Sequence, residues 1–321
     1  MPRVSEASGE GEPERLSDSP SPVSNDLRSF DPPSPRKRGE GTRRKRGEES
    51  GRRLAHNHKN KRTTPVKNPF DLSGKVAVIT GSSRGIGRAS AELLASLGAK
   101  VVVSSRKADA CQAVVDGIRA NGGDAHVIPC NISRRDEVEA LIDGAVAHYG
   151  PIDILVCNAA VNPYYGPLLD IADEAFDKIM GSNVKSNIWL CAKAIPAMAE
   201  RGGGSVVIIS SIGGLRGSTV IGAYGISKAA DFSLCRSLAG EWGMKSVRVN
   251  CIAPGLVKTD FARALWEDED NLKRRTATTP LRRIGEPHEI AGAVAYLGSD
   301  ASGFMTGQTI VIDGGVTTAS V

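Results

Sequence analysis

Short aliphatic runs alternate with longer amphipathic stretches along the chain from Phe70 onward. The aliphatic runs are apolar at nearly every position, which is typical of strands buried on both faces of a parallel sheet. Such runs predict strands at 76–79, 101–103, 126–128, 152–156, 205–209, 247–249 and 310–312. The stretches between them have the spacing of helices with one apolar face, as at 89–97, 137–148 and 290–297. This alternation predicts an α/β fold of the doubly wound, Rossmann type, with a seven-stranded parallel sheet in a single domain over residues 70–321.

Residues 1–69 have a different composition, rich in Pro, Ser, Gly, Arg and Glu and poor in aliphatic residues. Such a segment buries too little apolar surface to offset the entropy of an ordered chain, so we expect a disordered basic tail. Its basic runs at 35–38 and 43–46 could bind anionic partners such as nucleic acid or act as address signals. A solvated tail or an over-extended gene start is the favoured interpretation. A transit peptide is disfavoured by the early acids Glu6, Glu10, Glu12 and Glu14.

The net charge of +5 belongs to this tail. Residues 1–70 carry 16 Lys and Arg against 10 Asp and Glu, whereas the rest of the chain carries 25 against 26. The predicted folded part is therefore nearly neutral, and nothing in it predicts nucleic-acid binding. No apolar run reaches the ~18 residues of a membrane-spanning helix, and the start of the chain lacks a secretory signal. The six scattered cysteines favour reduced thiols, no metal site and a cytoplasmic location.

Tyr224 and Lys228 are four residues apart and follow Ser211. On a helix the two side chains share a face, so the ammonium can favour the phenolate of a tyrosine, whose pKa is ordinarily ~10. Ser211 follows the apolar run 206–209, so it can offer a hydroxyl to a substrate oxygen at the end of a strand. Taken alone, the spacing also fits a tyrosine that merely packs its helix. The interpretation as a proton-transfer pair depends on the other motifs.

The first predicted strand leads into Thr80-Gly81-Ser82-Ser83-Arg84-Gly85-Ile86-Gly87, and a helical pattern follows. Glycines allow a tight turn and a close approach of the backbone to a pyrophosphate, which the N-terminus of the helix attracts. The spacing differs from the common dinucleotide fingerprint Gly-x-Gly-x-x-Gly. It is instead Thr-Gly-x-x-x-Gly-x-Gly, in a strand-turn-helix context that favours cofactor binding over a plain loop.

With these motifs, residues 72–317 resemble the short-chain dehydrogenase/reductase family. The motif order matches: after the glycine turn come Asn158-Ala159, Asn183, Ser211, Tyr224-x-x-x-Lys228 and Pro254-Gly255. Segments 102–107 and 161–163 are most similar to the NADPH-dependent carbonyl reductases, and 3-oxoacyl-carrier-protein reductases are also similar. The resemblance implies hydride transfer between a nicotinamide cofactor and a small-molecule carbonyl or secondary alcohol.

The resemblance also implies a catalytic tetrad of Asn183, Ser211, Tyr224 and Lys228. Tyr224 is expected to protonate the developing alkoxide and Ser211 to bond the same oxygen. Lys228 is expected to bond the nicotinamide ribose and lower the pKa of Tyr224. Asn183 is expected to interrupt a helix and hold a water that passes protons to Lys228. The implied cofactor-binding residues are Gly81, Ser83, Arg84, Gly85, Ile86, Gly87, Ser105, Arg106, Asn131, Ile132, Asn158, Tyr224, Lys228, Ile252, Pro254, Gly255 and Thr259.

The choice of cofactor can be argued from the end of the second predicted strand. NAD-binding members carry an acidic residue there, whereas this chain has Ser104-Ser105-Arg106. The guanidinium groups of Arg106 and Arg84 favour a 2′-phosphate, so NADP(H) is the expected cofactor and NAD(H) the alternative. One departure from the family pattern is Ala160, where glycine is usual; we expect a slightly different loop there. The neighbouring Cys157 is expected to be buried structure.

Segments 162–166 and 261–266 are the expected walls and lid of a substrate pocket. The aromatic residues there are Tyr164, Tyr165, Phe261 and Trp266. They suit a moderately large apolar or aromatic carbonyl compound, although packing of the lid or a subunit contact explains them equally well. The acidic run 267–270 is expected to be exposed helix surface, which disfavours docking of an acidic carrier protein.

Other readings of the chain stay open. The enzyme alternatives are a 3-oxoacyl-carrier-protein reductase and an NAD-linked sugar or polyol dehydrogenase. A nucleotide-sensing module without activity is disfavoured, because such modules usually lose the tyrosine or the lysine. The resemblance implies a homotetramer in which helices around 183–198 and 224–242 pair across subunits.

Overall fold

The computed structural model describes residues 68–319. The predictions made for the tail, up to residue 67, lie outside the described residues. The strands are β1 (Val76–Thr80), β2 (Lys100–Ser104), β3 (Asp124–Val127), β4 (Ile154–Cys157), β5 (Gly204–Ile209), β6 (Val247–Pro254) and β7 (Thr309–Ile312). The α-helices are α1 (Gly85–Ser96), α2 (Ala108–Ala120), α3 (Arg135–Tyr149), α4 (Asp173–Met180), α5 (Ser186–Glu200), α6 (Gly222–Trp242), α7 (Glu269–Ala277) and α8 (Pro287–Gly298).

The seven strands form one sheet in the order β3-β2-β1-β4-β5-β6-β7, and every pair is parallel. The predicted doubly wound α/β fold is therefore confirmed. Strand β3 begins two residues earlier than predicted and ends before Ile128. Strand β6 runs well beyond the predicted 247–249, to Pro254, because its later residues pair with β7.

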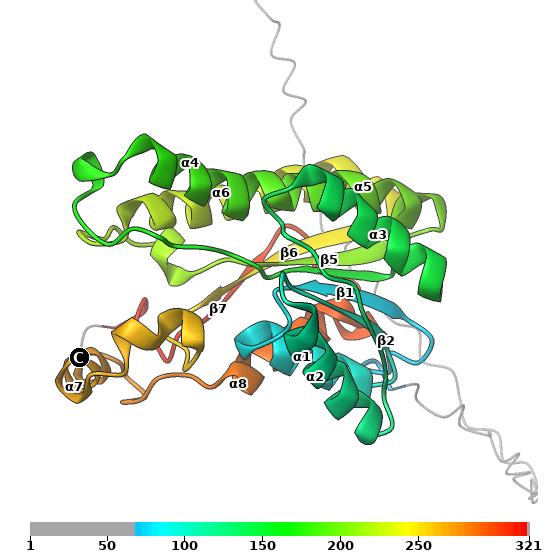
Figure 1. Ribbon diagram of the computed structural model, residues 1–321, viewed down its shortest axis with the longest axis horizontal. Helices are drawn as coiled ribbons and strands as arrows, with labels where there is room; N and C mark the ends of the chain where they lie inside the picture. Colours follow the sequence, from blue (N-terminus) through cyan, green and yellow to red (C-terminus); the bar gives the residue numbers. More distant parts are fainter. Residues whose placement is uncertain (1–67, 320–321) are drawn as a thin grey trace, which may run out of the picture. The chain divides into compact units, whose positions relative to one another are not determined.

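Helices cover both faces of the sheet. Figure 1 shows α3, α4, α5 and α6 on one face and α1, α2 and α8 on the other. Successive residues of β1 point alternately to the two faces of the sheet. Val76 and Val78 pack with α3 and α5, whereas Ala77 and Ile79 pack with α1 and α8. This two-sided burial explains why the strands are apolar at most positions.

The strand order places a topological switch point at the carboxyl ends of β1 and β4. The chain passes from β1 toward β2 on one side of the sheet, and β4 begins the series on the other side. Loops that leave adjacent strands in opposite directions open a crevice, and ligands of open α/β sheets bind there. The glycine turn follows β1 and the Asn158-Ala159 element follows β4, so both candidate motifs lie at this crevice.

The first described residues are tied to the body of the domain. The carbonyl of Pro69 accepts a hydrogen bond from the Ala301 amide at 3.1 Å. Leu72 is buried, with 1% of its surface exposed, and its amide donates to the Leu97 carbonyl at 2.9 Å. Residues from 68 onward are thus part of the packed unit.

Candidate active site

The glycine turn joins β1 to α1 in a conformation that needs glycine. Gly81 has a φ of +65°, which side chains other than glycine rarely adopt. A Cβ at Gly87 would lie 2.5 Å from the Gly81 carbonyl oxygen and 2.6 Å from Nδ2 of Asn158. No side chain caps the N-terminus of α1. The backbone N–H groups of its first turn therefore remain suited to an anion such as a pyrophosphate.

Asn158 holds this turn from the neighbouring strand. Its Nδ2 donates to the carbonyl oxygens of Thr80 at 2.8 Å and Gly81 at 3.2 Å. The Thr80 hydroxyl accepts hydrogen bonds from the amides of Asn158 at 3.1 Å and Ala159 at 3.2 Å. Asn158 thus fixes the geometry of the glycine turn. The part played by Thr80 was not predicted from the sequence.

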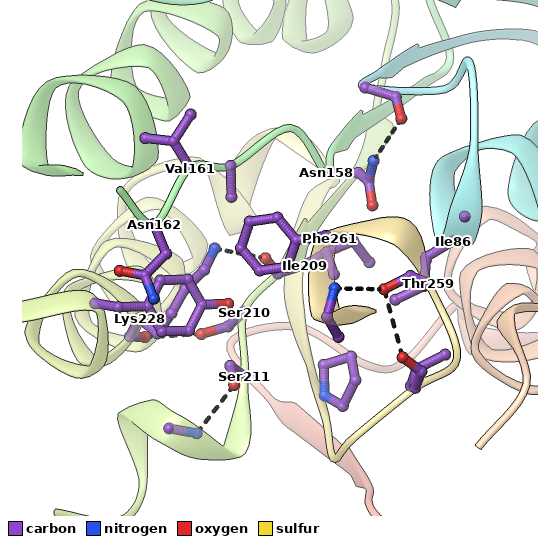
Figure 2. A pocket seen from close by; sticks show the side chains of 18 of the residues that line it. Ile86, Asn158, Val161, Asn162, Ile209, Ser210, Ser211, Lys228, Thr259 and Phe261 are labelled. Carbon is purple, nitrogen blue, oxygen red and sulfur yellow. Dashed lines mark hydrogen bonds between the residues drawn. The ribbon is translucent and has the colours of Figure 1, made fainter. Parts of the chain in front are cut away.

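A cavity of about 1050 Å³ lies over the switch point. It brings together most of the predicted site residues, from several strand ends: Gly81, Ser83, Arg84, Gly85, Ile86, Ser105, Arg106, Asn131, Ile132, Asn158, Ser211, Tyr224, Lys228, Pro254, Gly255 and Thr259. Gly87, Asn183 and Ile252 do not line it. Figure 2 shows Asn162, Lys228 and Ser211 on one side of the cavity and Ile86 and Thr259 on the opposite side.

Ser211, Tyr224 and Lys228 share the inner part of this cavity. Ser211 lies just past β5, and its Oγ accepts the Gly213 amide at 3.0 Å. Tyr224 and Lys228 lie one turn apart on α6, with the Lys228 Nζ 5.8 Å from the centre of the Tyr224 ring. A hydroxyl, a phenol and an ammonium therefore face one space, which is the arrangement expected from the sequence.

The pKa of Tyr224 is raised rather than lowered. Burial of the phenol is the largest cause; the Lys228 ammonium and a hydrogen bond with Ser211 lower the pKa but do not overcome it. Asp231 and Tyr165 raise it further. Lys228 thus acts in the expected direction, but burial outweighs it, and the pKa of Tyr224 is not lowered overall.

Lys228 is held from two sides. Its Nζ donates to the Ile209 carbonyl at 2.9 Å and to Oδ2 of Asp231 at 3.0 Å. Burial lowers the pKa of Lys228, but the charges of Asp231 and Tyr224 outweigh burial and raise it overall. The ammonium is therefore the stable form of this side chain.

Asn183 lies in the π-helical turn η2 (Gly181–Lys185), between α4 and α5. The helix is interrupted there, as expected from the sequence. The side-chain amide makes three hydrogen bonds: Oδ1 accepts the Val161 amide at 2.8 Å, and Nδ2 donates to the Val161 carbonyl at 2.9 Å and to the Ser227 hydroxyl at 3.0 Å. The backbone carbonyl accepts Nδ2 of Asn187 at 2.8 Å. The side chain of Asn183 therefore ties η2 to the loop after β4 and to α6. Its expected role in holding a water stays a prediction.

The other end of the cavity is polar and basic. Ser104 ends β2, Ser105 and Arg106 follow it, and Asn131 and Ile132 follow β3. The Ser104 Oγ is buried and has no hydrogen-bond partner. Within residues 68–319, Arg106 makes no ion pair, so its charge is uncompensated at this end of the cavity.

Arg84 has a neighbouring carboxylate that its sequence motif did not predict. Its Nη1 lies 3.6 Å from the Asp260 carboxylate. Asp260 is also bonded to Arg263 at 2.6 Å, and these arginines lower its pKa. A loop carboxylate distant in sequence thus balances part of the charge of Arg84.

The aromatic residues of the expected substrate pocket separate into two groups. Tyr165 and Phe261 line the cavity, and the Phe261 ring lies 6.0 Å from the Tyr224 ring. Tyr164 and Trp266 do not line it. Their polar atoms fix loops instead: the Tyr164 hydroxyl donates to the Pro167 carbonyl at 2.7 Å, and the Trp266 indole N–H to the Thr259 carbonyl at 3.0 Å. The acidic run 267–270 is exposed, as expected.

Several smaller expectations can be compared with the structure. Cys157 is buried, as are the other five cysteines, and none of them forms a disulfide. Ala160 lines the cavity, and its φ is not positive. Within the described residues, no cluster of His, Cys, Asp and Glu could hold a metal ion. No helix between residues 68 and 319 is long and apolar enough to span a bilayer.

Asn187 and Asp231 belong to the site but were not predicted from the sequence. Both are buried polar residues behind Lys228, and Asn187 donates to Oδ1 of Asp231 at 3.0 Å. A signal was present, because an acidic residue three places after the lysine falls on the same buried face of the helix. An unpaired charge is not tolerated there.

The fold and the cavity define the class of protein: a doubly wound α/β protein with a serine, a tyrosine and a lysine side chain in a cavity at its topological switch point. A family model described as Enoyl-(Acyl carrier protein) reductase matches residues 81–317. The rabbit (Oryctolagus cuniculus) Dehydrogenase/reductase SDR family member 4 is 42% identical over 244 residues, 76% of this chain and 94% of the relative. The chain belongs to the short-chain dehydrogenase/reductase family, so the predicted resemblance is confirmed.

Two solved structures extend the comparison. A 7α-hydroxysteroid dehydrogenase complexed with NADH and 7-oxo glycochenodeoxycholic acid is 37% identical, with a TM-score of 0.74, over 77% of this chain and 96% of that one. A gluconate 5-dehydrogenase from Burkholderia cenocepacia in complex with NADP and tartrate is 32% identical, with a TM-score of 0.75, over 78% and 98%. These similarities support the oxidoreductase class for this chain, and both neighbours were solved with a nicotinamide cofactor.

Proposed function

We propose that this protein is an NADP(H)-dependent carbonyl reductase or secondary-alcohol dehydrogenase in which Tyr224 is the general acid and base. The observation that carries the proposal is the shared cavity: Ser211, Tyr224 and Lys228 face the same space as the glycine turn. A cofactor lying along the strand ends would bring its reactive ring to these three side chains.

The residues present fit a dinucleotide. The crowding around Gly87 and the positive φ of Gly81 give a turn that a pyrophosphate can approach closely. Oγ of Ser104 and Oδ1 of Asn162 are buried without a hydrogen-bond partner, and both residues line the cavity, so both atoms can bond a ligand there. A bound nicotinamide cofactor would supply or accept the hydride.

The protein's own side chains would manage the proton and the charge. In reduction, Tyr224 would donate its phenolic proton to the substrate oxygen while Ser211 hydrogen-bonds the same atom. In oxidation, Tyr224 would act as the base. The Lys228 ammonium would stabilise the phenolate in both directions, since it already lowers the pKa of Tyr224. Asn183 would hold η2 in place beside Val161.

The proposed preference for NADP(H) rests on Arg106. A 2′-phosphate carries charge that a guanidinium binds through two hydrogen bonds, and no carboxylate pairs with Arg106 within residues 68–319. Asp260 weakens the contribution expected from Arg84, which leaves Arg106 as the main determinant.

The test of catalysis is Tyr224→Phe, assayed with a panel of ketones, aldehydes and secondary alcohols through NADPH absorbance. We expect kcat to fall by about 10²–10⁴-fold while the Kd for NADPH stays near the wild-type value, because only the proton donor is lost. Tyr296→Phe on α8 is the matched control, since that ring packs against Phe70 outside the cavity. Near-normal turnover by the Tyr224 variant would refute the assignment.

The same panel distinguishes the enzyme alternatives. A 3-oxoacyl thioester turned over far better than simple ketones would identify a 3-oxoacyl-carrier-protein reductase. Sugar acids or polyols oxidised with NAD⁺ would identify a sugar or polyol dehydrogenase. The exposed acidic run 267–270 disfavours an acidic carrier protein as the docking partner.

We further propose that the protein acts in the cytoplasm as a homotetramer. Exposed apolar side chains on two candidate pairing helices support this assembly: Ile188 on α5 is 45% exposed and Ile226 on α6 is 43% exposed. Light scattering of the purified protein would measure the mass directly, and a monomer would contradict the proposal.

A further inference from the structure

A buried carboxylate lies directly behind the candidate catalytic lysine. Asp231 is three residues after Lys228 on α6, and the two side chains are 0% and 2% exposed. The Lys228 Nζ donates to Oδ2 of Asp231 at 3.0 Å. Loss of either partner of this buried ion pair would destabilise the fold, because it would leave the other charge buried and uncompensated.

The other carboxylate oxygen is also bonded. Nδ2 of Asn187 on α5 donates to Oδ1 of Asp231 at 3.0 Å and to the Asn183 carbonyl at 2.8 Å. An unbroken chain of hydrogen bonds therefore runs from Lys228 through Asp231 and Asn187 to the π-helical turn. The network fixes the position of the lysine relative to the turn that holds Asn183.

The network also leaves Lys228 one free direction. Two of its three N–H groups are directed to the Ile209 carbonyl and to Asp231. Lys228 still lines the cavity, so the remaining N–H is available on the cavity side. Asp231 thereby selects the orientation in which the ammonium meets the cofactor side of the site.

Four side chains influence the pKa of Tyr224. Lys228 and Asp231 lie on the same helix, Ser211 follows β5, and Tyr165 lies in the loop after β4. Two thiols, Cys157 on β4 and Cys251 on β6, face the pair from the sheet. Hydrogen bonding to Cys191 and burial raise the pKa of Cys157. Hydrogen bonding to Cys235 and burial raise that of Cys251, so both thiols stay neutral.

We propose that Asp231, held by Asn187, is a positioning residue that directs the Lys228 ammonium and sets the pH range in which Tyr224 can act as a base. The inference rests on the proposed function for its kinetic consequence. Its electrostatic part concerns the protein without cofactor and is independent of that function.

The direction of the effect follows from the net charge of the buried group. With Asp231 ionised, the three side chains Tyr224, Lys228 and Asp231 together begin neutral and become negative when the first proton leaves. Without that carboxylate, Tyr224 and Lys228 begin positive and become neutral. Losing a proton from a buried positive group is easier than creating a buried negative one. This holds whichever of the two residues releases the proton, because they titrate as a coupled pair.

The experiment is Asp231→Asn, which removes the charge at nearly constant volume. In the pH profile of kcat/KM for alcohol oxidation, we expect the acid limb to move to lower pH by about one unit. Ultraviolet titration of tyrosinate in cofactor-free protein should show the same shift. The difference between each protein and its Tyr224→Phe counterpart isolates the signal of this phenol.

Two further variants sharpen the result. Asp231→Glu keeps the carboxylate and should hold the limb close to the wild-type position, even where kcat falls. Glu139→Gln removes a carboxylate from an exposed pair with Arg135 on α3 and should change nothing. If Asp231→Asn is recovered unfolded, Asp231→Ser, which leaves space for a water, is measured instead.

The outcomes separate this inference from the proposed function. Lower kcat in Asp231→Asn with an unmoved limb and an unmoved tyrosinate titration would mean a merely structural role and overturn the inference. A limb that moves to higher pH would overturn it as well. If no substrate is found but the tyrosinate titration shifts downward, the proposed function fails while the inference holds.

Discussion

Arg106 is the residue that decides cofactor choice in the proposed function. We expect Arg106→Glu to lower kcat/KM with NADPH by about 10–100-fold, because charge-assisted hydrogen bonds to a phosphate are each worth about 1.5–3 kcal/mol. The value with NADH should stay the same or rise, since a carboxylate can bond the ribose hydroxyls. Kinetics with both cofactors measure this, with Arg135→Ala on α3 as the control. An equal decrease in kcat/KM with NADPH and with NADH would show that Arg106 does not bind the 2′-phosphate.

Gly87 allows a second prediction at a single residue. A Cβ there would lie 2.5 Å from the Gly81 carbonyl oxygen, so Gly87→Ala must push the turn apart. We expect a loss of about 1–3 kcal/mol in the free energy of unfolding and weaker NADPH binding. Gly117→Ala on α2 is the matched control: nothing lies within 4 Å of its added Cβ, so it should be neutral or stabilising. Urea unfolding and cofactor titration check both; equal behaviour of the two variants would contradict the packing argument.

At residue level, the sequence predicts side chains that act through their own motif and misses those that act through a neighbour. Ser211, Tyr224 and Lys228 meet in one cavity, as their spacing and resemblance implied. The ion pair of Arg84 with Asp260 joins two loops that are far apart in the sequence. A single sequence does not show that these loops lie close together in space. Asp231 could have been found from its helical spacing to Lys228.

At the level of elements, the apolar runs predict the strands well because both faces of the sheet are buried. Strand ends are predicted less well: β6 continues to Pro254 because its pairing with β7 extends it, which is a tertiary effect. The interruption between α4 and α5 was expected around Asn183 only through the family resemblance. Its π-helical form depends on ties to Val161 and Ser227.

The start of α8 carries a pH-dependent contact. Glu289 receives two hydrogen bonds from Arg283, at 2.6 and 2.7 Å, and one from the Glu286 amide at 2.8 Å. Arg283 and the Glu286 amide lower the pKa of Glu289 from 4.5 to about 2. Because the folded-state pKa is the lower one, this contact stabilises the protein fully above pH 4.5 and progressively less toward about pH 2.

We therefore expect the free energy of unfolding of Glu289→Gln to fall less steeply than that of the wild type as pH drops through this range. Arg283→Met should flatten the profile in the same way, because it removes the guanidinium that lowers the pKa. Urea unfolding at a series of acidic pH values gives the free energy of unfolding of each protein against pH. The contributions of the other carboxyl groups cancel when the variant curve is subtracted from the wild-type curve. Parallel curves would show that the ion pair contributes no pH-dependent stability.

For the whole molecule, the point at which the packed domain begins can be tested by truncation. Leu72 is 1% exposed and lies against the α1 and α8 layer, and the Pro69 carbonyl is bonded to the Ala301 amide. We expect removal of residues 1–67 to leave the melting temperature and kcat/KM unchanged. Removal of residues 1–73 should cost about 2–5 kcal/mol, as deletion of a buried leucine does. Leu72→Ala in the full chain is the control and should account for most of that loss.

The same truncation tests the nucleic-acid interpretation of the basic tail. Residues 1–70 carry 16 Lys and Arg against 10 Asp and Glu, whereas the remainder is close to neutral. If the tail binds an anionic polymer, affinity of the full chain for DNA or RNA should fall steeply with added salt, and the shortened chain should not bind. Weak, salt-insensitive retention by both forms would exclude such a role. A destabilised enzyme after removal of residues 1–67 would instead show that the tail contributes to the fold.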